Sequence, residues 1–87
     1  MSLNDLLKNI AIEEHGQIPL LPIYSNHKEF KSGSVFVAIR GTSFDGHTIL
    51  GLLPNPFGLI VEDKAKLPAS YTGPYVVVSS TRKALDI

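Results

Sequence analysis

Short apolar runs separated by long polar gaps are the feature that most restricts the fold of this chain. They cover residues 35–39 (VFVAI), 59–61 (LIV) and 75–78 (YVVV). The first run is apolar at every position, as in a strand that is covered on both faces within a mostly parallel sheet. The gaps are long enough for crossover connections rather than hairpins. The sequence therefore predicts an α/β fold, with a small mixed, mostly parallel β-sheet and short flanking helices.

The N-terminal segment has the spacing of an amphipathic helix. Its apolar residues recur at i, i+3, i+4 and i+7, namely Leu3, Leu6, Leu7 and Ile10. This pattern predicts a helix over residues 2–15, with Ser2 as N-cap, Asp5 near the positive end of the helix dipole, and Gly16 as the stop. We expect its apolar face to pack on the sheet of the same domain rather than on a partner.

The remaining segments are shorter and less regular. Residues 18–25 contain Pro19 and Pro22, which cannot donate ladder hydrogen bonds, so this stretch is expected to be an edge strand or an extended lead-in. Residues 26–33 are polar and predict a loop. A short helix is expected to begin near His47.

The end of that helix and the segments after it are predicted from proline and helix-start residues. Pro54 and Pro56 should stop the helix that begins near His47, and residues 62–74 predict a loop or a single turn. Residues 79–81 (SST) are helix-start residues, followed by RKAL. We expect residues 1–87 to be one domain and a fragment of a longer protein, since this last helix begins just before Ile87.

The composition excludes several classes of function. Eight basic residues balance eight acidic ones, which argues against a nucleic-acid partner. The chain has no cysteine, so disulfide frameworks and cysteine-based zinc sites are excluded. Neither a signal peptide nor a membrane-spanning apolar run is present in these residues, so we expect no membrane partner and a cytoplasmic location.

No catalytic arrangement stands out. The sequence has no GxxxxGK[ST], GxGxxG, GxSxG or HExxH motif. The three histidines lack the spacing of a metal site. A triad of Ser25, His47 and Asp45 can be written down, but such combinations occur in most sequences, and we discount it. We therefore expect this chain alone to be inactive as an enzyme.

The most informative stretch is GSVFVAIRGTSFDGH, residues 33–47. It combines a turn glycine, a buried strand and a glycine-rich loop that leads into a helix. In open α/β sheets, ligands bind beyond the carboxyl ends of strands, often near a helix N-terminus. Residues 41–46 supply glycines, hydroxyls and amides there. The alternative is a plain strand-to-helix loop in which Asp45 is the N-cap.

This stretch resembles the N-terminal domain of the Mur ligases, in which the pattern is G-x-x-F-V-A-[ILV]-x-G-x-x-x-D-G-H. The resemblance continues through residues 58–62 (GLIVE), the run YVVV, and residues 81–85 (TRKAL). Mur ligases are ATP-dependent amide-forming enzymes that build the peptide stem of bacterial peptidoglycan. The opening residues 3–7 (LNDLL) look more like the MurE type, and the motif FDGH is also common in the MurF type.

The resemblance implies a function for a parent enzyme. A MurE-type ligase, or UDP-N-acetylmuramoyl-tripeptide synthetase, adds diaminopimelate or lysine to UDP-N-acetylmuramoyl-L-alanyl-D-glutamate. A MurF-type ligase adds D-alanyl-D-alanine to the resulting tripeptide. In either case the implied partners are the UDP-MurNAc-peptide substrate and the missing central and C-terminal ligase domains. ATP and Mg²⁺ would serve the parent enzyme, and this fragment would hold no cofactor or metal.

The resemblance also implies a binding site for the UDP part of that substrate. Its residues would be Ser25, His27, Lys28, Thr42, Ser43, Phe44, Asp45 and Gly46. Binding here would anchor the substrate while its peptide end reaches a distant ligation site. This chain departs from the family in having Asn-His-Lys at residues 26–28 in place of Asp-Ser-Arg. The alternative is a domain that binds no nucleotide and serves in folding and docking.

Overall fold

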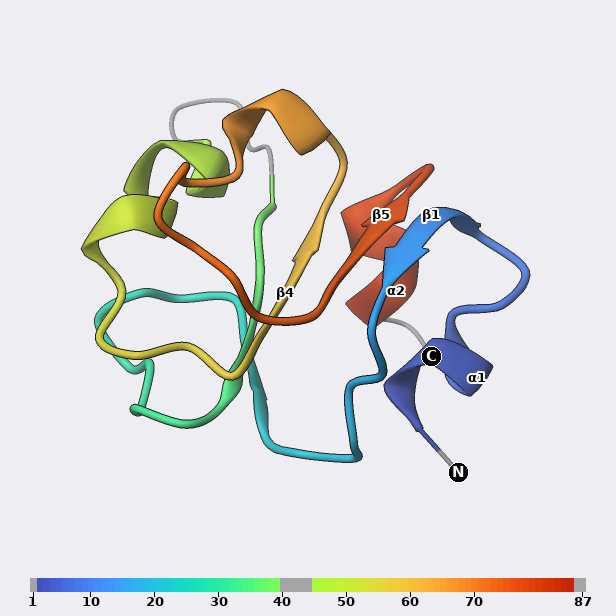
Figure 1. Ribbon diagram of the computed structural model, residues 1–87, viewed down its shortest axis with the longest axis horizontal. Coiled ribbons are helices and arrows are strands. Elements are labelled where there is room, and N and C mark those ends of the chain that lie inside the picture. The colour runs from blue at the N-terminus through green and yellow to red at the C-terminus, as the bar shows by residue number, and fades with distance from the viewer. Residues whose placement is uncertain (1, 40–44, 86–87) are drawn as a thin grey trace.

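In the computed structural model, which describes residues 2–39 and 45–85, one five-stranded sheet carries the fold (Figure 1). Its strands are β1 (Ala11–His15), β2 (Ile23–Tyr24), β3 (Val35–Val37), β4 (Gly58–Val61) and β5 (Tyr75–Val78). The strand order is β1-β5-β4-β3-β2. Neighbouring pairs are parallel from β2 to β5, and β1 pairs antiparallel with β5. The predicted mixed, mostly parallel α/β sheet is confirmed.

The central strands β3, β4 and β5 are buried on both faces, and their alternate side chains point to opposite sides of the sheet. On one face lie α1 (Leu3–Leu6) and α2 (Thr81–Leu85), whose Leu3 and Ala84 pack with apolar residues of β3, β4 and β5. On the other face lies the 3₁₀ helix η1 (Gly46–Leu52), whose Ile49 and Leu50 pack against Phe36. Figure 1 shows the sheet between these helical layers. Coverage on both faces explains why the central strands are apolar throughout.

The predicted N-terminal helix over residues 2–15 is wrong beyond its first turn. Ser2 and Asp5 form the expected capping box at the start of α1, but the α-helix is only Leu3–Leu6. Residues 11–15 are β1, and Ala11 pairs with Val78 on β5. A short isolated helix is marginal in water, whereas the free edge of β5 offers backbone partners. Gly16 therefore follows a strand, with φ of +72°, and does not stop a helix.

The other predicted elements are confirmed. The edge strand β2 lies within residues 18–25, and residues 26–33 form turns and coil. The first crossover contains η1, which ends before Pro54. The second contains a single 3₁₀ turn, η2 (Lys64–Lys66). No helix in the described part of the chain is long and apolar enough to cross a membrane.

Candidate functional site

The carboxyl ends of β2, β3 and β4 meet at one edge of the sheet, because these strands run parallel to one another. Ser25, His27 and Lys28 follow β2, and Ala38 and Ile39 follow β3. The two strands that precede the predicted UDP-binding residues in the sequence are therefore neighbours, and they end at the same edge of the sheet. Thr42, Ser43 and Phe44 lie outside the described residues.

The turn after β2 is held by Asn26 and Phe30. The Asn26 side-chain oxygen accepts from the Lys28 N–H at 2.9 Å, and the Asn26 carbonyl accepts from the Glu29 N–H at 3.1 Å. Phe30 is buried edge-on against Phe36 on β3. An aspartate forms the same kind of turn, so the change from Asp to Asn at position 26 preserves this geometry. Ser25, His27 and Lys28 are left exposed on the turn.

Gly46 is buried and packs closely against the backbone of Ala38 and Ile39, which follow β3. Its N–H donates to the Ile39 carbonyl at 2.8 Å. A Cβ atom at this position would lie 2.9 Å from the Ile39 nitrogen and 3.2 Å from the Ala38 Cα. Both are backbone atoms, which cannot move aside as a side chain can. The glycine therefore permits a close approach within the protein, and it joins the two ends of the segment 40–44.

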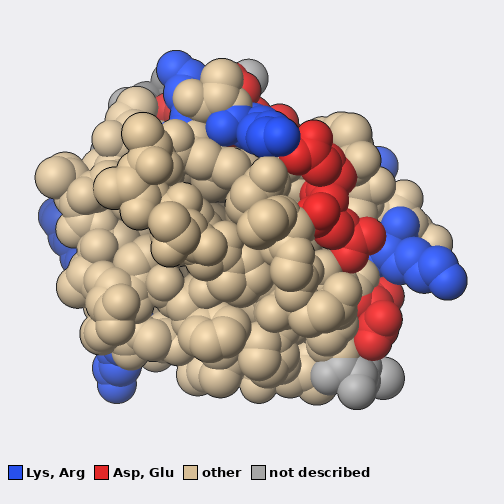
Figure 2. All heavy atoms as spheres, in the orientation of Figure 1, with Lys and Arg blue, Asp and Glu red and all other residues tan. Residues whose placement is uncertain are grey.

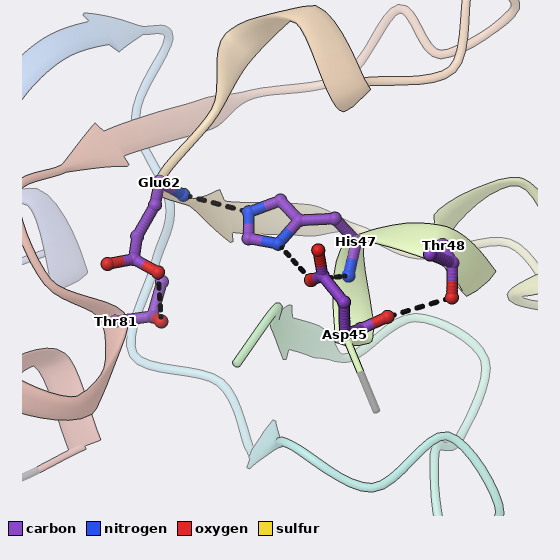
Figure 3. A network of polar contacts seen from close by, with 5 residues as sticks. All are labelled: Asp45, His47, Thr48, Glu62 and Thr81. Atoms are coloured by element: carbon purple, nitrogen blue, oxygen red, sulfur yellow. Dashed lines mark hydrogen bonds and ion pairs between the residues drawn. The ribbon is translucent and has the colours of Figure 1, made fainter. Parts of the chain in front are cut away.

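Asp45 caps η1 and also contacts the ring of His47 (Figure 3). Its Oδ1 accepts from the His47 N–H at 3.0 Å and lies 2.7 Å from the His47 Nδ1. On the other side of the ring, Nε2 accepts from the Glu62 N–H at 3.0 Å. The Glu62 carboxylate in turn accepts from the Thr81 hydroxyl at 3.4 Å. Asp45 is therefore the N-cap of η1, as the alternative of a plain strand-to-helix loop expects.

This geometry rules out a catalytic triad of Ser25, His47 and Asp45. The His47 side chain is fully buried, and both ring nitrogens have hydrogen-bond partners within the protein. The imidazole therefore cannot take a proton from a serine hydroxyl. Among residues 2–39 and 45–85, no group of His, Asp and Glu could hold a metal ion.

A cleft lies at the opposite edge of the sheet and was not predicted. It has a volume of about 470 Å³, and its lining includes Phe57, Tyr71 and Pro74 at the amino ends of β4 and β5. None of its lining residues is Lys, Arg, Asp or Glu, and burial raises the pKa of Tyr71 to about 12. Figure 2 shows a broad face of the molecule without charged side chains. Nothing in the cleft would offset the charge of a diphosphate.

Proline, glycine and aromatic residues at positions 53–57 and 68–74 are the sequence signal for this cleft. Segments of this kind form irregular surface backbone. Their coming together depends on the sheet, since one segment precedes β4 and the other precedes β5.

No protein-family model matches the chain. A curated sequence, UDP-N-acetylmuramoyl-L-alanyl-D-glutamate--2,6-diaminopimelate ligase from Aquifex aeolicus (strain VF5), is 40% identical over 62 residues. That match covers 69% of this chain, and it confirms the predicted resemblance to the MurE type. The chain is related to the Mur ligases.

Solved Mur ligase structures share this fold. Crystal structure I of MurF from Acinetobacter baumannii matches with a TM-score of 0.71 and 27% identity over 95% of this chain. The structure of UDP-N-acetylmuramoylalanyl-D-glutamyl-2,6-diaminopimelate--D-alanyl-D-alanyl ligase from the same organism gives a TM-score of 0.72 and 27% identity. The chain spans 12% of the length of the curated relative and 18% of the MurF chains. It therefore corresponds to a small part of a Mur ligase.

Proposed function

We propose that this chain is the N-terminal domain of a MurE-type ligase and that it holds the UDP part of a UDP-MurNAc-peptide substrate. The single observation that supports this proposal is the common edge of the sheet at which the parallel neighbours β2 and β3 end, directly before the two sequence segments with the predicted binding residues. Two loops from neighbouring parallel strands form the usual position for a ligand in such sheets. The relationship to Mur ligases supplies the identity of the ligand.

Each predicted residue has a chemical role in this proposal. Lys28 offsets the charge of the diphosphate, and His27 donates to a phosphate oxygen or stacks on the uracil ring. Ser25, Thr42 and Ser43 supply hydroxyl groups, and Phe44 supplies an apolar contact. Asp45 and Gly46 form the start of η1 and fix the second end of the loop.

The domain contributes to the reaction through binding at a distance. Holding the UDP part positions the peptide carboxylate in a ligation site supplied by the other domains of the parent enzyme. ATP and Mg²⁺ belong to those domains in this proposal, since this chain has no phosphate-binding loop and its described residues form no metal site. We expect this chain alone to be inactive and the parent enzyme to work in the cytoplasm.

Titration of this chain with UDP, followed by ¹H–¹⁵N NMR, tests the proposal. We expect amide shifts at residues 25–28 and 42–46 that saturate at millimolar UDP. Uridine is the matched control, because it carries the base without the diphosphate, and it should bind more weakly. Shifts confined to the uncharged cleft near Tyr71, or no shifts at all, would contradict UDP binding at the proposed edge.

A MurF-type parent is the second candidate, favoured by the solved MurF structures that cover 95% of this chain. The amino acid or dipeptide that the parent enzyme adds distinguishes these two candidates. A MurE-type enzyme adds diaminopimelate or lysine to UDP-MurNAc-L-Ala-D-Glu, and a MurF-type enzyme adds D-alanyl-D-alanine to the tripeptide. Concentration-dependent self-association of the chain without UDP-dependent shifts would favour the folding and docking module instead.

A further inference from the structure

The cleft at the amino ends of β4 and β5 is rich in rings and free of charge. Its volume is about 470 Å³, within the range of clefts that hold ligands. Phe57, which is 42% exposed, and Tyr71 supply aromatic rings. None of the described residues that line the cleft is Lys, Arg, Asp, Glu or His. A ligand should therefore be uncharged where it contacts this lining, because nothing there would offset a buried charge.

Contacts within the protein hold the lining of this cleft in place. The Tyr71 hydroxyl shares its proton between the carbonyls of Phe57 and Pro74, which fixes the orientation of the Tyr71 ring. The Gly33 N–H donates to the Asn55 carbonyl at 2.9 Å. Three prolines in the lining restrict its backbone further. A site that is already ordered loses less conformational entropy when a ligand binds.

Uncharged polar side chains also line the cleft. Asn55, Ser70 and Thr72 are exposed, and their side chains make no hydrogen bond with another residue in the described part of the chain. An amide group and two hydroxyl groups are therefore free to donate to a ligand. A ligand that matches this lining presents apolar rings together with carbonyl oxygens that accept hydrogen bonds.

A proline-rich peptide has this chemistry. In the polyproline II conformation it presents pyrrolidine rings, and its carbonyl oxygens have no internal hydrogen-bond donors. Its prolines carry no N–H that burial would leave unpaired. Aromatic-lined grooves bind such segments at little cost in entropy, because the segments are already extended. Addition of a strand to the sheet is not available at this position, since β4 and β5 each have a neighbour on both sides.

We propose that this cleft binds an uncharged, proline-rich peptide segment in the polyproline II conformation. The rings of Phe57 and Tyr71 contact prolines of the segment, and the Thr72 hydroxyl donates to one of its carbonyl oxygens. This inference goes beyond the proposed function and does not rest on it. The cleft lies at the amino ends of parallel strands, whereas the proposed UDP site lies at the opposite edge of the sheet.

Titration of this chain with decaproline, blocked at both ends, tests the inference by ¹H–¹⁵N NMR. We expect amide shifts at residues 55, 57 and 70–73 that saturate at millimolar peptide. A blocked peptide of alternating glycine and serine, of the same length, is the matched control, because it is uncharged but flexible and has no rings. It should give no saturating shifts. Added salt should leave the affinity for decaproline unchanged, since no charged residue is described in the lining.

Two pairs of variants test the contacts separately. Phe57→Ala should raise the dissociation constant of decaproline about tenfold, because it removes a ring that the peptide would cover. Leu52→Ala is its control, since Leu52 is 80% exposed and is not among the residues that line the cleft. Thr72→Val should raise the constant about fivefold by removing one hydrogen-bond donor. Thr72→Ser keeps the hydroxyl and should bind like the unsubstituted chain.

Several results would overturn the inference. Equal binding of the glycine–serine peptide would show that the polyproline II conformation is not recognised. Shifts of the same amides on dilution of the chain without peptide would mean that a second copy occupies the cleft. Shifts of these amides with N-acetylglucosamine and none with decaproline would identify a site for a neutral sugar instead. Failure of the UDP titration would leave this inference standing, because the two titrations report on different residues.

Discussion

Single residues in η1 and on the turn after β2 differ sharply in which substitutions they can accept. Gly46 has backbone atoms close to the place where a Cβ would stand, whereas Gly51, in the same 3₁₀ helix, has no atom within 4 Å of that place. Lys28, on the turn after β2, is exposed. Packing therefore restricts which residues can replace Gly46, whereas the proposed ligand restricts which residues can replace Lys28.

Gly46→Ala should destabilise the domain by about 1–3 kcal/mol, because the added methyl group overlaps the Ile39 and Ala38 backbone. Gly51→Ala is the matched control, and we expect it to be neutral or to stabilise by up to about 1 kcal/mol through helix propensity. Urea denaturation of both variants measures the free energy of unfolding. Equal effects at the two positions would show that the close approach at Gly46 is unimportant.

Lys28→Arg should tighten UDP binding, by an expected few-fold, because a guanidinium can contact a phosphate through two parallel hydrogen bonds and an ammonium cannot. Lys28→Ala should weaken binding, and more strongly at low salt. Lys31→Ala changes another exposed lysine in the same loop and serves as the control. Calorimetric titration with UDP gives the affinities. A weakening by Lys31→Ala as large as that by Lys28→Ala would indicate general electrostatic attraction instead of a specific contact.

At the scale of the elements, contacts between connecting segments set how the strands enter and leave the sheet. The Tyr71 hydroxyl, in the second crossover, shares its single proton between the carbonyls of Phe57 and Pro74, which directly precede β4 and β5. At the far edge, the Lys64 ammonium lies 2.6 Å from the Glu13 carboxylate on β1. The contact of Tyr71 with Pro74 is partly buried, whereas its contact with Phe57 and the ion pair of Lys64 with Glu13 are exposed.

Tyr71→Phe should destabilise the domain by about 1 kcal/mol, because the variant keeps the ring and leaves two carbonyls without this donor. Tyr75→Phe removes a hydroxyl whose partners are the exposed Glu13 carboxylate and the exposed Lys64 ammonium, and should change stability by less than about 0.5 kcal/mol. Chemical denaturation compares the two. A larger loss in Tyr75→Phe would contradict the role given to Tyr71.

The ion pair between Glu13 and Lys64 should be visible in acid titration. The hydrogen bond from Lys64 holds the pKa of the Glu13 carboxyl below its ordinary value. A lowered folded-state pKa adds stability above the unfolded pKa, and this contribution disappears as the pH falls through the folded pKa. Lys64→Ala should therefore raise the Glu13 pKa toward its ordinary value.

A carbon-13 NMR titration of the Glu13 carboxyl measures this change, and the same titration in high salt should reduce the difference. The effect on stability should be small, because both groups are exposed. An unchanged Glu13 midpoint in Lys64→Ala would show that another group lowers the pKa.

At the scale of the whole molecule, the sheet concentrates stability at its centre. The central strand β4 has parallel neighbours on both sides and is buried along its length, whereas β2 is a two-residue edge strand. Apolar layers cover both faces of the central strands. Opening the centre of the sheet therefore requires loss of the entire core.

Native-state hydrogen exchange should follow this order. We expect the amides of β4 to exchange on the order of 100-fold more slowly than those of β2, because opening free energies run from near zero in loosely held elements to the global value in core strands. Backbone amide exchange followed by NMR measures both. Similar protection in β2 and β4 would mean that the sheet opens only as a unit.

The sequence by itself determined the strands β3, β4 and β5, because continuous burial on both faces requires apolar residues at every position. It also determined the cap at Asp45 and the prolines that end η1, since both depend on neighbouring residues alone. Through the motif in residues 33–47 it predicted the Mur ligase relationship. These features are local, so a reader of the sequence can find them.

Only the tertiary structure decided the secondary structure of residues 11–15 and the hydrogen-bond partners of His47. The helical spacing of residues 3–10 and the stop expected at Gly16 placed residues 11–15 in a helix, but the free edge of β5, far along the chain, pairs with them as a strand. The sequence alone assigns no role to His47. The fold places the backbone N–H of Glu62, at the end of β4, within hydrogen-bond distance of its ring. Pairing between distant segments supplies hydrogen bonds that no local pattern encodes, and for that reason it prevailed over the helical periodicity.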